Sequence, residues 1–176
     1  MAFSTTTAQR GINSPYESII RDASAQYGVP TALIKAIICQ ECSTWRADCT
    51  NLADPSYGLM QVNTKAHPDV TPAQMLDPSQ NIPYGTQYLA YQINRYSGDL
   101  EKAASAYNAG TATTVNYSNY VVPVMQYYSW FLANDVGGGG NGVEPPTTDW
   151  GMGENDLKLI AGLVVGGLLI FALLRR

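Results

Sequence analysis

The sequence is poor in charge, and in positive charge above all. It has 10 lysines and arginines against 14 aspartates and glutamates in 176 residues, which gives a net charge of −4. A protein that neutralises nucleic-acid phosphates needs a basic surface, so we expect no nucleic-acid partner. The chain also has a single histidine, His67, and no pair of Cys-x-x-Cys units of the kind that form structural zinc sites. We therefore expect neither a metal nor another cofactor.

Cysteine is scarce as well. The three cysteines, Cys39, Cys42 and Cys49, lie within eleven residues. At most one intrachain disulfide can form, which leaves one thiol over and does not determine the redox compartment. Two interpretations stay open: Cys39 and Cys42 are small apolar residues buried in a core, or Cys42 is bridged to Cys49.

Long apolar runs are absent until the end of the chain. Residues 1–14 form an N-terminal segment without an apolar stretch, which predicts neither a secretory signal peptide nor a membrane span. Residues 136–156 contain GGGGNG followed by Val-Glu-Pro-Pro-Thr-Thr, a composition typical of linkers that bury no core. We therefore expect one globular domain over residues 15–135.

Residues 157–176 are predicted to anchor the protein in a lipid membrane. Residues 159–174 are sixteen uncharged residues with lysine or arginine on both sides. As a helix they extend about 24 Å, and flanking cations that snorkel to the interface make up the remaining bilayer thickness. A buried helix of the main domain is the alternative, although the glycine linker separates the two. The GxxxG spacing of Gly162 and Gly166 suggests self-association of the span.

Apolar spacing and turn residues predict a mainly helical domain. Ser14 is expected to cap a first helix, with Pro15 at its first position and Glu17 completing a capping box. Residues 51–63 combine Asp-Pro-Ser and Tyr-Gly, which favours turns and a small hairpin. Helices are expected from Pro15 to Gly28, from Pro30 to Glu41, over 79–97, over 100–108, and over 117–132 with a kink or a start at Pro123.

Glu41 stands at the end of an apolar helix face. Ile34, Ile37 and Ile38 recur before it at three- and four-residue spacing, so we expect its carboxyl to emerge from an apolar wall into a cleft. Apolar surroundings disfavour the charged form of a carboxyl, which is how a glycosidase keeps an acid protonated near neutral pH. On periodicity alone, an ordinary surface glutamate is the alternative.

Four separated sequence blocks carry a family resemblance. They are Ala36-Ile37-Ile38-Cys39-Gln40-Glu41-Cys42, Tyr57-Gly58-Leu59-Met60-Gln61-Val62, Asn81-Ile82 with Gly85 and Tyr88-Leu89, and Ala106-Tyr107-Asn108-Ala109-Gly110. With these blocks in this order, the chain resembles the soluble lytic transglycosylases from about residue 15 to residue 128. The resemblance implies a mainly α fold of the α+β, goose-lysozyme-like kind, and a catalytic domain that acts on the glycan strands of peptidoglycan.

The same resemblance implies roles for individual residues. Glu41 matches the catalytic acid and base, and substrate-binding roles fall to Met60, Gln61, Tyr107 and Asn108. Met60 and Gln61 are expected to line the sugar cleft, Tyr107 to hydrogen-bond near the catalytic carboxylate, and Asn108 to shape the site.

Ser56 and Cys42 lie beside these motifs. Ser56 is a further candidate for substrate binding, although serine in an Asp-Pro-Ser turn also serves ordinary turn chemistry. Cys42 follows Glu41 where the family usually has serine, which replaces a good hydroxyl partner by a weak one. This departure affects how Glu41 is tuned more than which residue is the acid.

The resemblance implies a mechanism with one carboxylate. Glu41 protonates the glycosidic oxygen, the N-acetyl group of the muramic sugar assists, and Glu41 then takes a proton from the 6-hydroxyl of the sugar, leaving a 1,6-anhydro end. A goose-type hydrolase is the enzymatic alternative, with Asp48 or Asp54 activating water. A domain that binds glycan without cleaving it is the structural alternative.

The arrangement of domain, linker and anchor suggests a cellular context. It resembles the virion enzymes of bacteriophages with an internal membrane, which open the cell wall locally during genome entry. Arg175-Arg176 after the span, against Glu154 and Asp156 before it, favours a cytoplasmic C-terminus and an outward catalytic domain. We therefore expect a single-pass protein of a virion membrane, or otherwise of the bacterial envelope.

Overall fold

The computed structural model describes residues 2–12 and 14–135. These residues form helices and one small antiparallel sheet, so the expected mainly α fold is confirmed. The elements are α1 Thr5–Ile12, α2 Glu17–Tyr27, α3 Thr31–Glu41, β1 Thr50–Asn51, β2 Ser56–Tyr57, β3 Val62–Asn63, α4 Pro72–Met75, α5 Pro78–Arg95, α6 Leu100–Ala109, the π-helical turn η1 Tyr117–Val121, and α7 Val122–Asn134.

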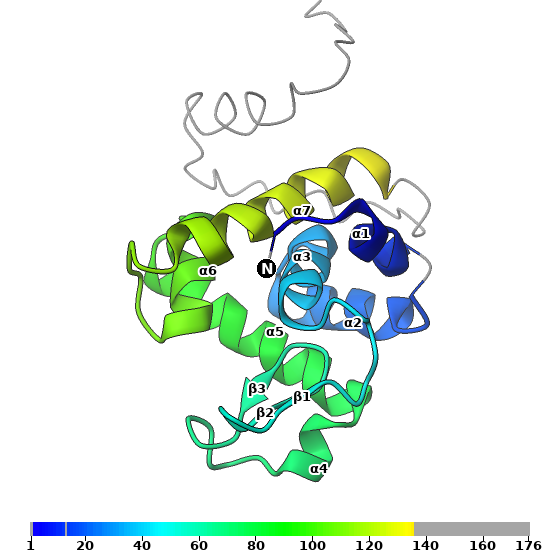
Figure 1. Ribbon diagram of the computed structural model, residues 1–176, viewed down its shortest axis with the longest axis vertical. Coiled ribbons are helices and arrows are strands. Elements are labelled where there is room, and N and C mark those ends of the chain that lie inside the picture. The colour runs from blue at the N-terminus through cyan, green and yellow to red at the C-terminus, as the bar shows by residue number, and fades with distance from the viewer. Residues whose placement is uncertain (1, 13, 136–176) are drawn as a thin grey trace, which may run out of the picture.

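Helix α3 forms the centre of the core. All nine residues from Ala32 to Gln40 are buried, and α7 packs along the helix while α1 and α2 also contact it. In Figure 1, α7 lies across α3 at one end of the domain, and the sheet lies with α4 at the opposite end. Each buried Leu or Ile side chain contributes roughly 1.5 to 3 kcal/mol relative to exposure. Only the two terminal residues of the helix, Thr31 and Glu41, are less buried.

The start of α2 differs from the prediction. The helix begins at Glu17, and the Ser14 hydroxyl accepts a hydrogen bond from the Tyr16 backbone N–H at 3.1 Å. The predicted capping box at Pro15 is therefore wrong, because Ser14-Pro15-Tyr16 forms a turn before the helix. The predicted end is confirmed: Gly28 has φ 70° and its N–H donates to the Ser24 carbonyl at 2.9 Å.

Helix α1 occupies the N-terminal segment, for which no element was predicted. Ala8 is fully buried, and the Ser4 backbone N–H donates to the Tyr127 hydroxyl at 3.0 Å. Gly11 allows the close approach of this helix, because a Cβ there would lie 2.6 Å from the Phe131 ring. The segment therefore packs on the same core as α3 and α7.

A buried ammonium joins three parts of the helical core. Lys35 on α3 is fully buried, and its Nζ lies 2.6 Å from Glu17 Oε2 and 2.5 Å from Asp135 Oδ2. Burying an unpaired charge is costly, whereas two carboxylates compensate it here. The ion pairs connect the start of α2 and the residue after α7 to the central helix.

The segment predicted as turns with a hairpin forms a three-stranded sheet. Strand β2 pairs with both neighbours, with Thr50 opposite Tyr57 and Ser56 opposite Asn63. The strands are two residues each, and a buried amide supports the sheet from α5. Asn81 accepts from the Met60 backbone N–H at 2.8 Å and donates to the Tyr57 carbonyl at 2.9 Å.

The later helices follow the predictions with one difference. Those expected over 79–97 and 100–108 are α5 and α6. The stretch from Tyr117 begins as the π-helical turn η1 and continues directly into α7, where Pro123 lies in the first turn. Proline is tolerated there because the first N–H groups of a helix have no internal acceptor.

The predicted linker, residues 136–156, and the predicted membrane anchor with its GxxxG pair, residues 157–176, lie outside the described residues. Among the helices of residues 2–12 and 14–135, none combines the length and the apolar character needed to cross a membrane.

Candidate active site

A cleft of about 370 Å³ separates the sheet from the helices that follow it. Glu41 at the end of α3 is one of its lining residues. The sheet side contributes Asn51, Asp54, Ser56, Gln61 and Asn63, and the other side contributes His67, Tyr84, Tyr88, Tyr107 and Asn108. Carboxylate, amide and hydroxyl groups together with aromatic faces suit a ligand rich in hydroxyls.

The carboxyl of Glu41 lies where the apolar core meets this cleft. Burial raises its pKa from 4.5 to about 7, and a hydrogen bond from Tyr120 opposes the rise. The physical cause is the one predicted from the apolar face of α3, since Ile37 and Ile38 are fully buried beside it. With a pKa raised this far, the carboxyl stays protonated at pH values where an ordinary glutamate is charged, as a general acid requires.

Tyr120 in η1 orients this carboxyl. Its hydroxyl donates to Glu41 Oε1 at 2.5 Å, and the ring is buried. Burial, and next the charge of Glu41, raise the pKa of Tyr120 well above its ordinary value, so the phenol stays a donor. Tyr120 therefore holds one of the two carboxyl oxygens, Oε1, at the edge of the cleft.

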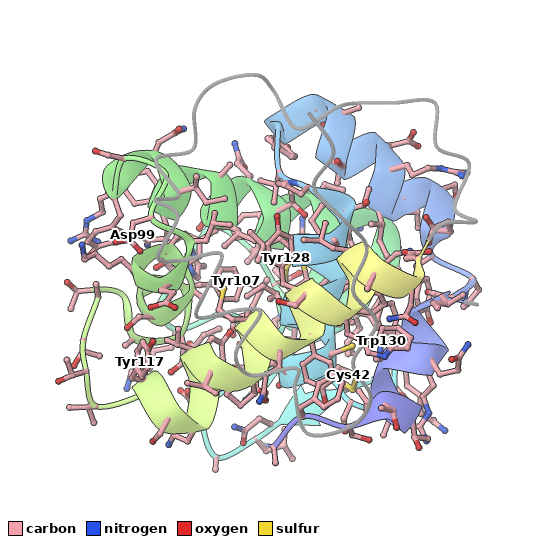
Figure 2. The ribbon with its side chains drawn as sticks, turned by 90° about the horizontal axis from the view of Figure 1, so that it is seen from above. Cys42, Asp99, Tyr107, Tyr117, Tyr128 and Trp130 are labelled. Atoms are coloured by element: carbon pink, nitrogen blue, oxygen red, sulfur yellow. A yellow bond between two sulfur atoms is a disulfide. The ribbon has the colours of Figure 1, made fainter. Side chains whose placement is uncertain are left out.

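Tyr107 lies beside Glu41 but does not bond to it. Its hydroxyl donates to the Met60 carbonyl at 2.8 Å. Burial, and next the charge of Glu41, raise the pKa of Tyr107 well above its ordinary value. Figure 2 shows Tyr107 directed into the interior, whereas Asp99 and Tyr117 lie at the edge of the domain.

Met60 does not line the cleft, contrary to the prediction. Its side chain is fully buried, in contact with the core, and only its backbone carbonyl takes part by accepting the bond from Tyr107. Thr86 donates a hydrogen bond to its sulfur at 3.8 Å. Met60 is therefore a packing residue that supports Tyr107.

The remaining predicted binding residues all lie in the cleft. Gln61 is held there by hydrogen bonds from its Nε2 to the carbonyls of Gly58 at 2.7 Å and Cys49 at 3.2 Å. Ser56 on β2 is buried within the lining, and Asn108 accepts a hydrogen bond from Asn116 at 3.0 Å. The structure therefore brings Gln61, Ser56 and Asn108 together with Glu41.

The two candidate acids of a hydrolase occupy different places. Asp48 is outside the cleft lining and forms an exposed ion pair with Arg46, which holds the pKa of this carboxyl below its usual range. Asp54 lines the cleft, is exposed to water and accepts a hydrogen bond from Asn63 Nδ2 at 2.5 Å. Only Asp54 of the two shares a cavity with Glu41.

Aromatic residues extend the cleft along α5. The His67 ring meets Tyr84 and Tyr88 edge-on, with ring centroids 5.5 and 4.9 Å apart, and the Tyr84 hydroxyl donates to Asp69 at 2.9 Å. Tyr88 in turn contacts Tyr107 with a centroid distance of 5.5 Å. Aromatic faces are the surfaces on which sugar rings commonly rest.

The cysteines resolve into one disulfide and one thiol. Cys42 is bonded to Cys49, as one of the two interpretations had it, and Cys39 is a buried free thiol whose pKa burial raises to about 12. Within residues 2–12 and 14–135, no three histidine, cysteine or acidic side chains gather in a way that could hold a metal ion.

Tyr120 is the site residue that sequence reasoning missed. It follows Glu41 by 79 positions and belongs to a segment interrupted by Pro123, so its apolar neighbours indicated only a helix. His67 and Tyr84 were likewise not predicted to line the cleft, whereas Asp54 had been one of the two candidate acids of the hydrolytic alternative.

Residues 18–123 match the sequence model of one protein family, described as the transglycosylase SLT domain. The match extends from the first turn of α2 into the first turn of α7, and so includes Glu41, Gln61, Tyr107 and Tyr120.

Proposed function

We propose, on the premise that this chain belongs to the transglycosylase SLT domain family, that Glu41 cleaves the β-1,4 bond between N-acetylmuramic acid and N-acetylglucosamine. A chain with this domain is a lytic transglycosylase, an enzyme that acts on peptidoglycan. The observation that carries the role of Glu41 is its position: a carboxyl at the boundary of core and cleft whose pKa is raised to about 7.

In the first step, the protonated Glu41 donates to the glycosidic oxygen, and the bond from the muramic C1 to that oxygen breaks. Tyr120 holds Oε1, so we assign the proton donor to the other carboxyl oxygen, Oε2. The N-acetyl group of the muramic sugar stabilises the positive charge that develops at C1. The chain therefore needs no carboxylate on the opposite face of the sugar ring.

In the second step, the Glu41 carboxylate takes the proton of the sugar's own 6-hydroxyl while that oxygen bonds to C1. This returns Glu41 to the protonated form and leaves a 1,6-anhydro end, with no water consumed. A pKa of about 7 suits both steps, because a group whose pKa lies near the working pH can both give up and take back a proton readily.

The hydrolytic alternative rests on one observation, the presence of Asp54 in the same cleft. A carboxylate placed across the sugar ring could activate water, and the product would then have a reducing end. The two reactions differ in mass by one water, so the products distinguish them.

The test digests purified peptidoglycan with the full-length protein and identifies the released fragments by mass spectrometry. Anhydro-muramic ends are expected from the native protein. Glu41→Gln is expected to reduce their release by about 10³-fold, in the range for loss of a general acid and base. Glu101→Gln is the matched control and should keep full activity, because Glu101 on α6 is half-buried, accepts a hydrogen bond from Tyr117 and lies outside the cleft lining.

Two other results would contradict the proposal in different ways. Reducing ends would make the protein a hydrolase and direct attention to Asp54. Binding to peptidoglycan without cleavage would favour the glycan-binding alternative.

The composition of residues 136–176 supports a further part of the proposal. A glycine-rich linker followed by sixteen uncharged residues suits an enzyme tethered to a lipid membrane. We place this enzyme in the virion of a bacteriophage with an internal membrane, where it opens the cell wall locally during genome entry. Detection of the protein in purified particles tests this, and its confinement to host envelope fractions would contradict it.

A further inference from the structure

The Cys42–Cys49 disulfide joins the residue after Glu41, at the end of α3, to the residue before strand β1 of the sheet. We propose that this disulfide is a positioning element of the reaction: it holds Gln61 in place opposite Glu41, and the enzyme loses activity when a thiol reductant opens the bridge. The inference rests on the proposed role of Glu41.

One end of the bridge is fixed by the helix that carries the acid. Cys42 directly follows Glu41, and its backbone N–H donates to the Ile38 carbonyl at 2.7 Å as the cap of α3. Its side chain is 2% exposed. Cys42 therefore lies at the end of the buried helix α3, and its sulfur is a fixed point of attachment for Cys49.

The other end of the bridge supports the opposite side of the cleft. The Cys49 carbonyl accepts hydrogen bonds from the Gly58 backbone N–H at 2.8 Å and from Gln61 Nε2 at 3.2 Å. Gln61 has φ 47°, a conformation that non-glycine residues adopt only where surroundings hold them. A displacement of Cys49 is therefore transmitted to a lining residue of the cleft.

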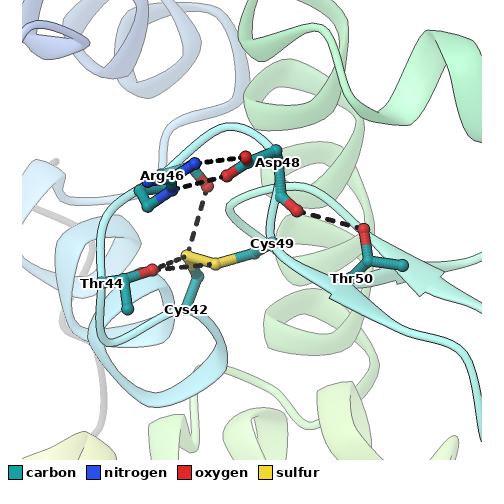
Figure 3. Close-up of polar contacts among 6 residues, drawn as sticks. All are labelled: Cys42, Thr44, Arg46, Asp48, Cys49 and Thr50. Atoms are coloured by element: carbon teal, nitrogen blue, oxygen red, sulfur yellow. Dashed lines mark hydrogen bonds and ion pairs between the residues drawn. A yellow bond between two sulfur atoms is a disulfide. The ribbon is translucent and has the colours of Figure 1, made fainter.

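The loop between the two cysteines is held unevenly. Its first half is anchored, because Trp45 is buried and the Ser43 carbonyl accepts from Arg10 at 2.8 Å. In the second half, the hydrogen bonds and ion pairs that the structure describes for Arg46 and Asp48 remain within residues 42–50, as Figure 3 shows. Besides its own packing against the core and its bonds to Gly58 and Gln61, Cys49 is therefore joined to the buried end of α3 by the disulfide.

The bridge is open to attack from the Cys49 side. Cys49 is half-buried, whereas Cys42 is buried. The thiolate of a dithiol reductant attacks the Cys49 sulfur, the S–S bond breaks, and Cys42 leaves as a thiolate that takes a proton from water. The second thiol of the reductant then displaces Cys49, so two electrons pass to the protein and the reductant ends as a cyclic disulfide. The freed Cys42 thiol has an acceptor at the Arg46 carbonyl, 3.3 Å away.

The experiment measures cleavage of soluble glycan strands by the full-length protein, oxidised and after treatment with dithiothreitol. Opening the bridge is expected to lower kcat by about 10- to 100-fold, because a misplacement near 1 Å costs that much. The alkaline limb of the pH profile should also move to lower pH, since water admitted beside Glu41 lowers its raised pKa. The double variant Cys42→Ser with Cys49→Ser should show the same low activity and no response to reductant.

Cys39→Ala is the matched control, since it removes the buried thiol and leaves the bridge intact. It should respond to dithiothreitol as the native protein does. Equal kcat and equal pH profiles for the oxidised and reduced proteins would overturn the inference alone. So would a loss that only follows the folded fraction measured by circular dichroism, with an unchanged pH profile. Absence of cleavage by the oxidised protein would overturn the proposed function, and this inference with it.

Discussion

The two sides of the cleft are held by different forces. The helical wall, formed by Glu41, Tyr107 and Asn108, rests on the apolar core around α3. The sheet wall, formed by Asn51, Asp54, Ser56, Gln61 and Asn63, rests on hydrogen bonds, a disulfide and a glycine. Apolar burial both fixes a side chain and changes its pKa, whereas the polar support of the sheet wall fixes the backbone and leaves Asn51 and Asp54 exposed to water.

The two carboxyl groups of the cleft illustrate this difference. Glu41 emerges from the apolar core, and burial raises its pKa to about 7. Asp54 is exposed to water on a short sheet and bonds to Asn63. The carboxyl of Glu41 is therefore suited to proton transfer, whereas the carboxyl of Asp54 is suited to hydrogen bonding.

Gly58→Ala is expected to have the largest effect, a loss of stability, because it disrupts the packing that supports the sheet wall. Gly58 has φ 77°, and a Cβ there would lie 2.1 Å from the Met75 carbonyl oxygen and 2.6 Å from the Asn81 amide. Backbone cannot yield cheaply to such a clash, so the free energy of unfolding should fall by at least about 4 kcal/mol. Urea denaturation followed by circular dichroism measures the loss.

Gly28→Ala is the control for backbone conformation. Gly28 has a similar φ, 70°, but a Cβ added there would meet no atom within 4 Å. The substitution should cost only about 1 to 2 kcal/mol, the penalty for an L-residue in the left-handed region. Equal losses for the two variants would show that conformation, and not the contact with α4, makes Gly58 necessary.

Tyr120→Phe tests the helical wall and should have the next largest effect. The hydroxyl lowers the pKa of Glu41, against the larger effect of burial. Its removal should therefore raise that pKa further and move the alkaline limb of activity to higher pH, because the acid stays protonated longer. We also expect kcat to fall about tenfold, near 1.4 kcal/mol, as the carboxyl loses its orienting bond. A pH profile of cleavage measures both changes.

Tyr117→Phe is the matched control for this variant. Tyr117 lies in the same π-helical turn, but its hydroxyl donates to the half-buried Glu101, which lies outside the cleft lining. Its activity and pH profile should remain those of the native protein. A shift of the Tyr120→Phe limb to lower pH would mean that the hydroxyl does not stabilise the charged form of Glu41.

The helical wall could be predicted from the sequence further than the sheet wall. Ile34, Ile37 and Ile38 are close in sequence to Glu41, so their periodicity indicated both the helix and the apolar surroundings of the acid. Gly28 is likewise a local signal, since a glycine after an apolar helix commonly ends it.

Contacts between distant segments could not be predicted in this way. Tyr120 reaches Glu41 across 79 positions, and Asn81 reaches the Met60 backbone across 21. Met60 was assigned to the cleft by the family resemblance, which does not show which way a side chain points. Met60 and Gln61 lie in the turn between β2 and β3, where Met60 packs in the core and Gln61 lines the cleft. The pairing of Cys42 with Cys49 was one of two interpretations because cysteine spacing does not determine connectivity.

Asp54→Asn should have the smallest effect, and it tests whether the sheet wall supplies any chemistry. The amide keeps the size of the side chain and loses only a charge that is already exposed to water. If Glu41 alone transfers protons, cleavage should fall less than about threefold, within the range of a single exposed contact. Asp48→Asn, which alters the acid outside the cleft, should leave the rate unchanged.

A loss of about 10²-fold or more for Asp54→Asn alone would mean that this carboxylate activates water. The sheet wall would then be a second catalytic wall, and the reaction would be hydrolysis.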